Sequence, residues 1–165
     1  MEGLSTICLR NTKVIIVGTF PSEQSLKYKE YYSNPANKFW NLLGDVLGIN
    51  LKVKGYDEKI EALLENKIGL SDTIIQCERE KSSDKDIINP EFNDFRELDC
   101  PKLRIILANG QKAYDNLWKE CCVPRGVRID KLISSSGARV MKYQEKLENW
   151  KWNFHRYQIK PCKSL

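Results

Sequence analysis

The sequence contains little of what metal sites and nucleophilic hydrolases commonly use. Its 165 residues include one histidine, His155, and six cysteines, no two of which form a Cys-x-x-Cys pair. A histidine-based zinc site or a Ser-His-Asp triad is therefore poorly supported. An iron–sulfur cluster is also disfavoured, because the adjacent Cys121 and Cys122 cannot easily both ligate one cluster. We predict no metal site and no cofactor.

Long apolar runs and glycine-rich phosphate loops are missing as well. No run approaches the ~20 apolar residues of a membrane span, and the first residues lack a signal-peptide layout. We therefore expect an intracellular protein with no membrane contact, cytoplasmic or, in a eukaryotic host, nuclear. The length predicts one domain over residues 1–165. The net charge of +5 permits nucleic-acid binding but does not establish it.

Apolar runs that read as strands alternate with segments of helical periodicity. We predict strands at 14–17, 69–80, 103–108 and 129–133, and helices at 38–47, 55–67, 111–118 and 144–154. This alternation predicts an α/β fold with three α/β/α layers and a short, mainly parallel, roughly four-stranded central sheet. Residues 18–36 are predicted as a long loop, and residues 81–95 as a loop followed by a short helix.

The stretch Val14–Trp40 carries the densest concentration of candidate site residues. Its first strand leaves the sheet at Gly18 and Pro21. Because ligands bind just outside the carboxyl ends of parallel strands, the polar and aromatic residues that follow are expected at a site. These residues are Phe20, Ser22, Tyr31, Tyr32, Asn34 and Asn37.

Two motifs in this stretch, GTFPS at 18–22 and YYSNPANKFW at 31–40, resemble the uracil-DNA glycosylase superfamily, in particular its hypoxanthine-DNA (deoxyinosine) glycosylase branch. Segments 69–87, 92–118 and 132–150 extend the resemblance. It implies a monofunctional, monomeric base-excision-repair enzyme without a cofactor. Such an enzyme flips out a deaminated base, with hypoxanthine as first choice, and hydrolyses its N-glycosidic bond. The implied substrate is double-stranded DNA, with single-stranded DNA as an additional candidate.

Two alternatives stay open. SGARV at 136–140 resembles mismatch-directed uracil/thymine glycosylases, which favours that activity. A catalytically weak nucleic-acid-binding module of the same fold is the second alternative.

The resemblance assigns catalysis to Asn37. An amide can orient a water molecule or donate a hydrogen bond to a leaving base, although it is not a general base. Asparagine is also a common helix cap, and a helix is predicted to begin next to this residue. The sequence therefore leaves Asn37 as a catalytic residue, a cap or both.

The resemblance also nominates base-binding residues. Tyr32 would stack on the flipped base and Phe20 would wall the pocket, although both are also typical core residues. Ser71 and Asp72 would read the base, with the Asp72 carboxylate accepting from N1–H of hypoxanthine; a strand-edge cap or ion pair is the alternative for Asp72. Asn109 would line the pocket, but Asn-Gly also suits a plain turn.

A serine-rich loop is expected to contact DNA. The resemblance implies that it clamps phosphates and inserts a wedge into the minor groove. A serine-rich surface turn is the alternative. The DNA-contact candidates are Ser22, Ser134, Ser135, Ser136, Gly137, Ala138 and Arg139. In a different part of the chain, Arg79 and Asp84 are five residues apart and are interpreted as a structural ion pair.

Overall fold

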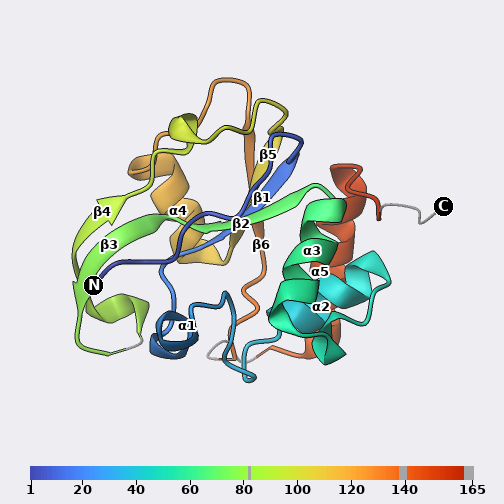
Figure 1. The fold of residues 1–165 in the computed structure, drawn as a ribbon, viewed down its shortest axis with the longest axis horizontal. Helices are drawn as coiled ribbons and strands as arrows, with labels where there is room; N and C mark the ends of the chain where they lie inside the picture. The colour runs from blue at the N-terminus through green and yellow to red at the C-terminus, as the bar shows by residue number, and fades with distance from the viewer. Residues whose placement is uncertain (82, 138–140, 162–165) are drawn as a thin grey trace.

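The computed structural model describes residues 1–81, 83–137 and 141–161 (Figure 1). Four strands form the central sheet in the order β2-β1-β5-β6, and every neighbouring pair is parallel. The strands are β1 (Val14–Gly18), β2 (Ile68–Asp72), β5 (Ile105–Asn109) and β6 (Arg128–Leu132). The parallel, four-stranded sheet predicted from the sequence is confirmed.

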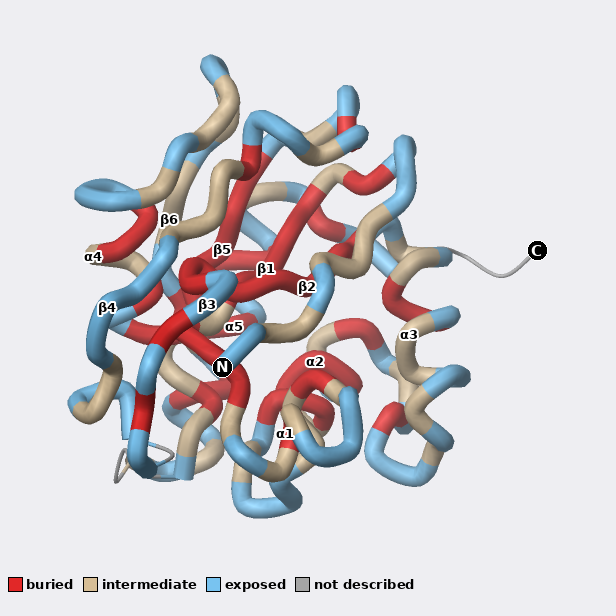
Figure 2. Tube along the Cα trace, turned by 60° about the vertical axis from the view of Figure 1, so that its left-hand side comes forward, coloured by how far each residue is buried: buried red, intermediate tan, exposed pale blue. Residues whose placement is uncertain are grey.

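Helices and loops bury both faces of this sheet. Along β1 the side chains alternate, so that Val14 and Ile16 join one apolar cluster while Ile15 and Val17 join another. The first cluster packs against α2 (Phe39–Leu47), α3 (Tyr56–Glu65) and α5 (Tyr143–Arg156), the second against α4 (Gln111–Lys119). Burial on both sides explains the continuous apolar run of β1, and Figure 2 shows β1 and β5 as buried. The three-layer prediction is therefore confirmed.

A second, smaller sheet was not predicted. The predicted strand 69–80 is two strands, because Thr73 and Ile74 donate to the carbonyls of Gly18 and Thr19 and lead the chain away from β1. The second half, β3 (Ile74–Arg79), pairs antiparallel with β4 (Ile87–Phe92). β4 contains Pro90, which is tolerated because β4 is an exposed edge strand.

A short helix also interrupts the long loop predicted at 18–36. This helix, α1 (Glu23–Tyr28), begins after Ser22, whose hydroxyl accepts from the backbone N–H of Ser25. Six residues are too few to show helical periodicity, so only the N-cap serine signals it. The described residues also form three short 3₁₀ turns: η1 (Leu51–Val53), η2 (Asp84–Asp86) and η3 (Phe95–Glu97).

Within the described ranges, no helix combines the length and the apolar character that crossing a membrane requires.

The sheet core should be the main source of stability. Leu107 is fully buried on β5, so Leu107→Ala should lower the free energy of unfolding by about 2–5 kcal/mol through lost burial and a residual cavity. Urea denaturation measures this change. Val53→Ala, at a side chain that is 73% exposed, is the control and should stay within about 0.5 kcal/mol of wild type. Equal effects of the two substitutions would contradict the proposed core.

Candidate active site

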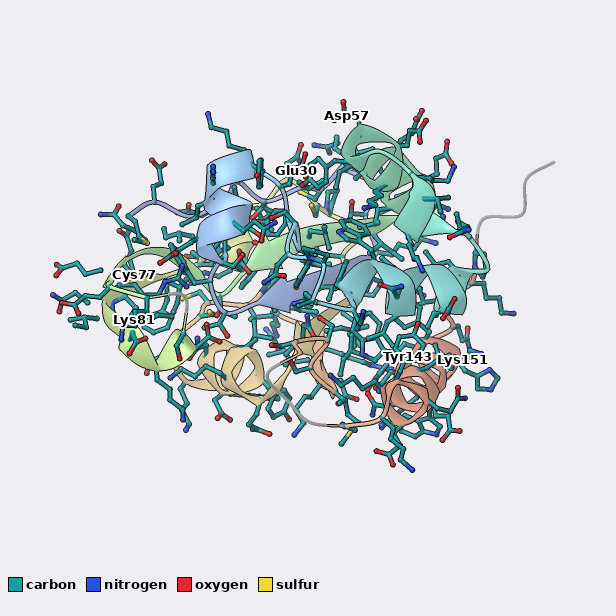
Figure 3. The ribbon with its side chains drawn as sticks, turned by 90° about the horizontal axis from the view of Figure 1, so that it is seen from below. Glu30, Asp57, Cys77, Lys81, Tyr143 and Lys151 are labelled. Carbon is teal, nitrogen blue, oxygen red and sulfur yellow. The ribbon has the colours of Figure 1, made fainter. Side chains whose placement is uncertain are left out.

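A cavity of about 360 Å³ opens where β1, β2 and β5 end. This volume is near the lower limit of the ~300–1,000 Å³ that small-molecule sites occupy. Figure 3 shows the molecule from below, with α1 at the upper left of the sheet and α5, which carries Tyr143 and Lys151, at the lower right. The lining of this cavity includes nine predicted site residues: Phe20, Ser22, Tyr32, Asn37, Asp72, Asn109, Ser134, Ser136 and Gly137. Segments far apart in the sequence therefore meet in one cavity, as the sequence predicted.

Asn37 directly precedes Lys38, the N-cap of α2, accepts a hydrogen bond from the first N–H of that helix, and lines the cavity. Its Oδ1 accepts from the backbone N–H of Phe39 at 3.0 Å and from the Ser135 hydroxyl at 2.7 Å. These two donors occupy both lone pairs of the carbonyl oxygen. The Asn37 NH₂ group forms no hydrogen bond to any residue in the described ranges, so it is the group that Asn37 can offer to a ligand. Capping and a site role are thus compatible.

Ser135 holds this arrangement together. Its hydroxyl accepts from Asn109 Nδ2 at 2.8 Å, its backbone N–H donates to Asn109 Oδ1 at 2.9 Å, and its carbonyl accepts from Lys38 N–H at 3.0 Å. Ser135 is fully buried. The predicted DNA contact of Ser135 is therefore wrong, because these internal partners occupy its hydroxyl and its backbone groups.

The remaining described part of the serine loop borders the cavity. Ser134, Ser136 and Gly137 all line it. A Cβ on Gly137 would lie 3.1 Å from the carbonyl oxygen of Ala36, so glycine permits the loop to approach the segment that carries Asn37. The carbonyl of Ser136 accepts from the buried Lys146 Nζ at 2.9 Å. Sequence reasoning missed this lysine anchor, because nothing in a helical pattern marks a lysine as buried.

Two further DNA-contact candidates, Ala138 and Arg139, lie outside the described residues. Ser22 lines the cavity while it caps α1, so the position predicted for it is compatible with a ligand contact.

Two aromatic rings border the cavity, and each has one face covered by the protein. Tyr32 stacks on Phe39 with ring centroids 3.8 Å apart, and Arg79 lies over the Phe20 ring at 4.9 Å. The Tyr32 hydroxyl accepts from Asn109 Nδ2 at 3.3 Å. Tyr32 also has a φ of 54°, a left-handed conformation that is uncommon for a bulky residue. Tyr32 and Phe20 therefore pack against the protein and also line the cavity, while their contact with a flipped base stays a prediction.

Asp72 is a buried carboxyl group in the wall of the cavity. It is 6% exposed, and its Oδ2 has no hydrogen-bond partner among the described residues. Burial and the nearby Asp84 raise the pKa of Asp72 to about 7, although the Gly18 N–H and Arg79 oppose this rise. A Cβ on Gly18 would lie 2.6 Å from Asp72 Oδ1, so glycine is required for this close approach.

Ser71 is turned away from this cavity. Its hydroxyl lies 2.6 Å from Thr6 Oγ1 and accepts from Asn93 Nδ2 at 3.1 Å. Side chains alternate along a strand, so the face that presents Asp72 cannot also present Ser71. The predicted base-reading role of the Ser71 side chain is therefore wrong; Ser71 instead fastens the N-terminal segment to β2.

Arg79 and Asp84 do not form the predicted ion pair within 4 Å; the ion pairs of the described residues lie elsewhere. Arg79 is buried, donates from Nη2 to the Pro21 carbonyl at 2.6 Å and leaves Nε and Nη1 without described partners. Asp84 lines the cavity, and burial raises the pKa of its carboxyl group while the Thr19 side chain and Arg79 oppose the rise. Asp84 is thus a site residue that the sequence indicated only as half of a pair.

Metal-binding side chains do not gather in the described ranges, where no group of three His, Cys, Asp or Glu residues has a suitable arrangement. The described cysteines are free thiols: Cys8, Cys77, Cys100, Cys121 and Cys122.

Comparison with known proteins relates the sequence of this chain to one family of enzymes. The model of the uracil DNA glycosylase superfamily matches residues 4–157. A protein of Methanosarcina acetivorans named hypoxanthine DNA glycosylase is 37% identical over 153 residues, covering 90% of this chain and 94% of its own. A protein of the same name from Methanosarcina barkeri is 33% identical, covering 94% and 98%.

A solved structure from the same superfamily has a similar fold. The solution NMR structure of a candidate uracil DNA glycosylase from Methanosarcina acetivorans matches with a TM-score of 0.80 and 36% identity, over 95% of this chain and 98% of that one.

The buried carboxyl group should make stability depend on pH. Because the pKa of Asp72 is raised from 3.8 to about 7, the folded state holds a proton that the unfolded state releases, and the free energy of unfolding should fall as pH rises between these values. Asp72→Asn should remove this decline. The variant should gain stability over wild type by a few kcal/mol at pH 8 and by almost nothing at pH 4, at about 1.4 kcal/mol per pKa unit.

Denaturant unfolding at both pH values measures the difference. Glu61→Gln, an exposed change on α3, serves as control. A variant that tracks wild type at pH 8 would show that Asp72 carries no buried charge.

Ser135→Ala tests the hydrogen-bonded linkage. The substitution removes one partner each from Asn37 Oδ1 and Asn109 Nδ2, and unsatisfied buried polar groups typically cost about 1–3 kcal/mol. Thermal or urea unfolding should show that loss, whereas Ser5→Ala, at an exposed serine, should show almost none. A loss no larger than that of Ser5→Ala would rule out Ser135 as the linking residue.

Proposed function

The chain belongs to the uracil DNA glycosylase superfamily, and on that premise we propose that it is a monofunctional DNA glycosylase of base-excision repair whose preferred base is hypoxanthine. DNA is the macromolecule on which it acts. The observation that carries the proposal is the cavity at the strand ends, whose lining brings together Asn37, the aromatic residues Tyr32 and Phe20, and the Asp72 carboxyl group.

The aromatic rings suit a base rotated out of the duplex. Flipped bases are held by stacking on aromatic or apolar walls and by hydrogen bonds to their edges. Tyr32 packs on Phe39 and Phe20 packs against Arg79, and both residues line the cavity, where a base would stack on Tyr32 and lie against Phe20. Their protein-side contacts fix the rings before the base arrives, which reduces the ordering needed on binding.

Asn37 would assist the departure of the base. The glycosidic bond breaks more easily when negative charge on the leaving base is stabilised by a preorganised donor. Phe39 N–H and Ser135 Oγ occupy Oδ1, so this oxygen is not free to accept a hydrogen bond from a water molecule. The NH₂ group remains, and it would donate to the base as the charge develops. The proposed catalytic role is therefore donation to the leaving group.

Asp72 would read the base. Hypoxanthine presents N1–H beside the O6 carbonyl, and an ionised carboxylate accepts from N1–H while a protonated carboxyl group donates to O6. With a pKa of about 7, Asp72 supplies both forms near neutral pH. Uracil presents a similar N3–H beside O4, which keeps the mismatch-directed uracil/thymine activity as a second candidate. The names of the relatives favour hypoxanthine.

Duplex DNA would approach over the serine loop. Ser134, Ser136 and Gly137 border the cavity, as a loop that positions a flipped nucleotide requires. We propose that the enzyme binds double-stranded DNA as a monomer, without a cofactor, inside the cell.

The test separates catalysis from capping at one residue. Asn37→Asp keeps an oxygen for Phe39 N–H and Ser135 Oγ but removes the NH₂ donor, whereas Asn37→Ala removes both. Oligonucleotide duplexes with one deoxyinosine or one deoxyuridine are incubated with each protein, and alkali then cleaves abasic sites. Asn37→Asp should unfold within about 1 kcal/mol of wild type yet lose about 10²–10³-fold in excision rate, the usual effect of removing one such donor.

Each other outcome has a definite meaning. Excision at deoxyuridine alone would assign the mismatch-directed activity. Full activity in both variants would leave Asn37 as a cap only. Duplex binding without excision of either base by the wild type would replace the enzyme with a nucleic-acid-binding module.

A further inference from the structure

The opposite edge of the central sheet carries a row of basic residues. Parallel pairing brings Lys67, Lys13 and Arg104 side by side, each directly preceding the first residue of its strand. Backbone hydrogen bonds join them laterally: Lys13 N–H donates to Lys67, Arg104 N–H donates to Lys13, and Arg128 N–H donates to Arg104, each at 2.9 Å. We call Lys67, Lys13, Arg104 and Arg128 the basic row. Neighbouring strands lie ~4.8 Å apart, so the row is a closely spaced line of positive charge.

Two hollows run along the basic row. One of about 200 Å³ is bordered by Lys13, Lys67 and Arg104, and a second of about 380 Å³ by Arg104 and Arg128. Arg104 belongs to both hollows, so they adjoin. Lys160 adds a cation to the first hollow and Arg156 to the second. The row is therefore a concave surface, and a ligand seated there can contact several cations at once.

The positive charge of the row is not neutralised within the described chain. Lys67 above all, together with desolvation, Arg104 and Lys102, lowers the pKa of Lys13. Among the ion pairs of the described residues, only Arg156 at the margin of the row has a carboxylate partner, Asp130 at 3.5 Å. Like charges on neighbouring strands destabilise a sheet. A bound polyanion would relieve this repulsion.

The basic row faces away from the active-site cavity. The cavity lies at the C-terminal strand ends and the row at the N-terminal ends, and five-residue strands separate the two edges by roughly 16 Å. In Figure 1 the loop that leads into β6 lies at the top, while α1 and the cavity loops lie at the bottom. The DNA segment whose base enters the cavity therefore meets a different face of the protein.

We propose that the basic row is a second binding surface, for the phosphate backbone of another nucleic-acid segment. Protein partners usually need an apolar centre in their interface, but the large apolar side chains exposed in the described chain lie outside both hollows. Lysine and arginine contacts to phosphate require no such centre and no base sequence. With the cavity on one edge and the row on the other, the protein holds two DNA segments at once, which suits transfer between segments during a search for damage.

The test measures bridging of two duplexes. Undamaged short duplexes labelled with a donor or an acceptor dye are mixed with the wild-type protein at low salt, and energy transfer reports that one protein holds both. Lys67→Glu/Arg104→Glu should reduce bridging at least about tenfold. Lys52→Glu/Lys54→Glu, in and directly after η1, is the matched control, because it changes the net charge equally and neither residue lines a hollow of the row. In wild type, the logarithm of the bridging constant should fall with the logarithm of salt concentration by about 0.9 per phosphate contact.

Folding and excision are measured on the same variants. Because Lys67→Glu/Arg104→Glu replaces repulsion around Lys13 with attraction, its melting temperature at low salt should not fall below that of wild type. Excision of deoxyinosine from a short duplex should be unchanged, since the row does not touch the cavity.

Three results would overturn the second surface: no bridging by wild type, bridging by Lys67→Glu/Arg104→Glu equal to that of the control, or row-dependent binding of a poly-glutamate peptide in place of DNA. Bridging does not depend on excision. Row-dependent bridging by a wild-type protein that excises no base would therefore refute the proposed function alone.

Discussion

Parallel pairing of four short strands is the constraint on which the rest of the structure depends. It collects every C-terminal strand end along one edge of the sheet and every N-terminal end along the other. Gly18, Asp72 and Asn109 end their strands and meet at the cavity, while Lys13, Lys67 and Arg104 precede theirs and form the basic row. A sheet of only five-residue strands keeps these two edges close, yet directs them to opposite sides of the molecule.

The cavity itself depends on a hydrogen-bonded linkage that joins loops of different origin. Ser135 donates to Asn37 and accepts from Asn109, and Asn109 in turn donates to Tyr32. These bonds are partly or fully shielded from water, where a satisfied polar network fixes one arrangement and an unsatisfied member is costly. The same bonds determine what Asn37 offers: its oxygen faces inward to the helix and the loop, so its NH₂ group is left for the ligand.

The buried carboxyl group of Asp72 lowers stability at the wall of the cavity. It is buried and leaves one oxygen without a described partner, an arrangement that a protein optimised for stability alone would avoid. Arg79, buried beside Phe20 with two unpartnered nitrogens, adds a second such group close to the cavity. Strained and unsatisfied groups concentrate at functional sites because ligand contacts compensate for them. The left-handed backbone of Tyr32 in the same wall follows this pattern.

The layered parallel fold, the gathering of polar residues at the strand ends, and most residues that line the cavity, including Asn37, Tyr32, Asp72 and Asn109, could be predicted from the sequence alone. Strand and helix periodicities and the GTFPS and YYSNPANKFW motifs are local features, so they can be read along the chain. The tertiary structure was needed to show which polar atoms of these residues are already hydrogen-bonded within the protein and which face the cavity. Ser135 is buried and hydrogen-bonds Asn37 and Asn109, and the Ser71 side chain points to the face opposite Asp72. Arg79 and Asp84 form no ion pair within 4 Å, and β3 pairs with β4. Each outcome depends on a partner distant in sequence or on the face to which a side chain points, and neither is encoded by residue type or spacing alone.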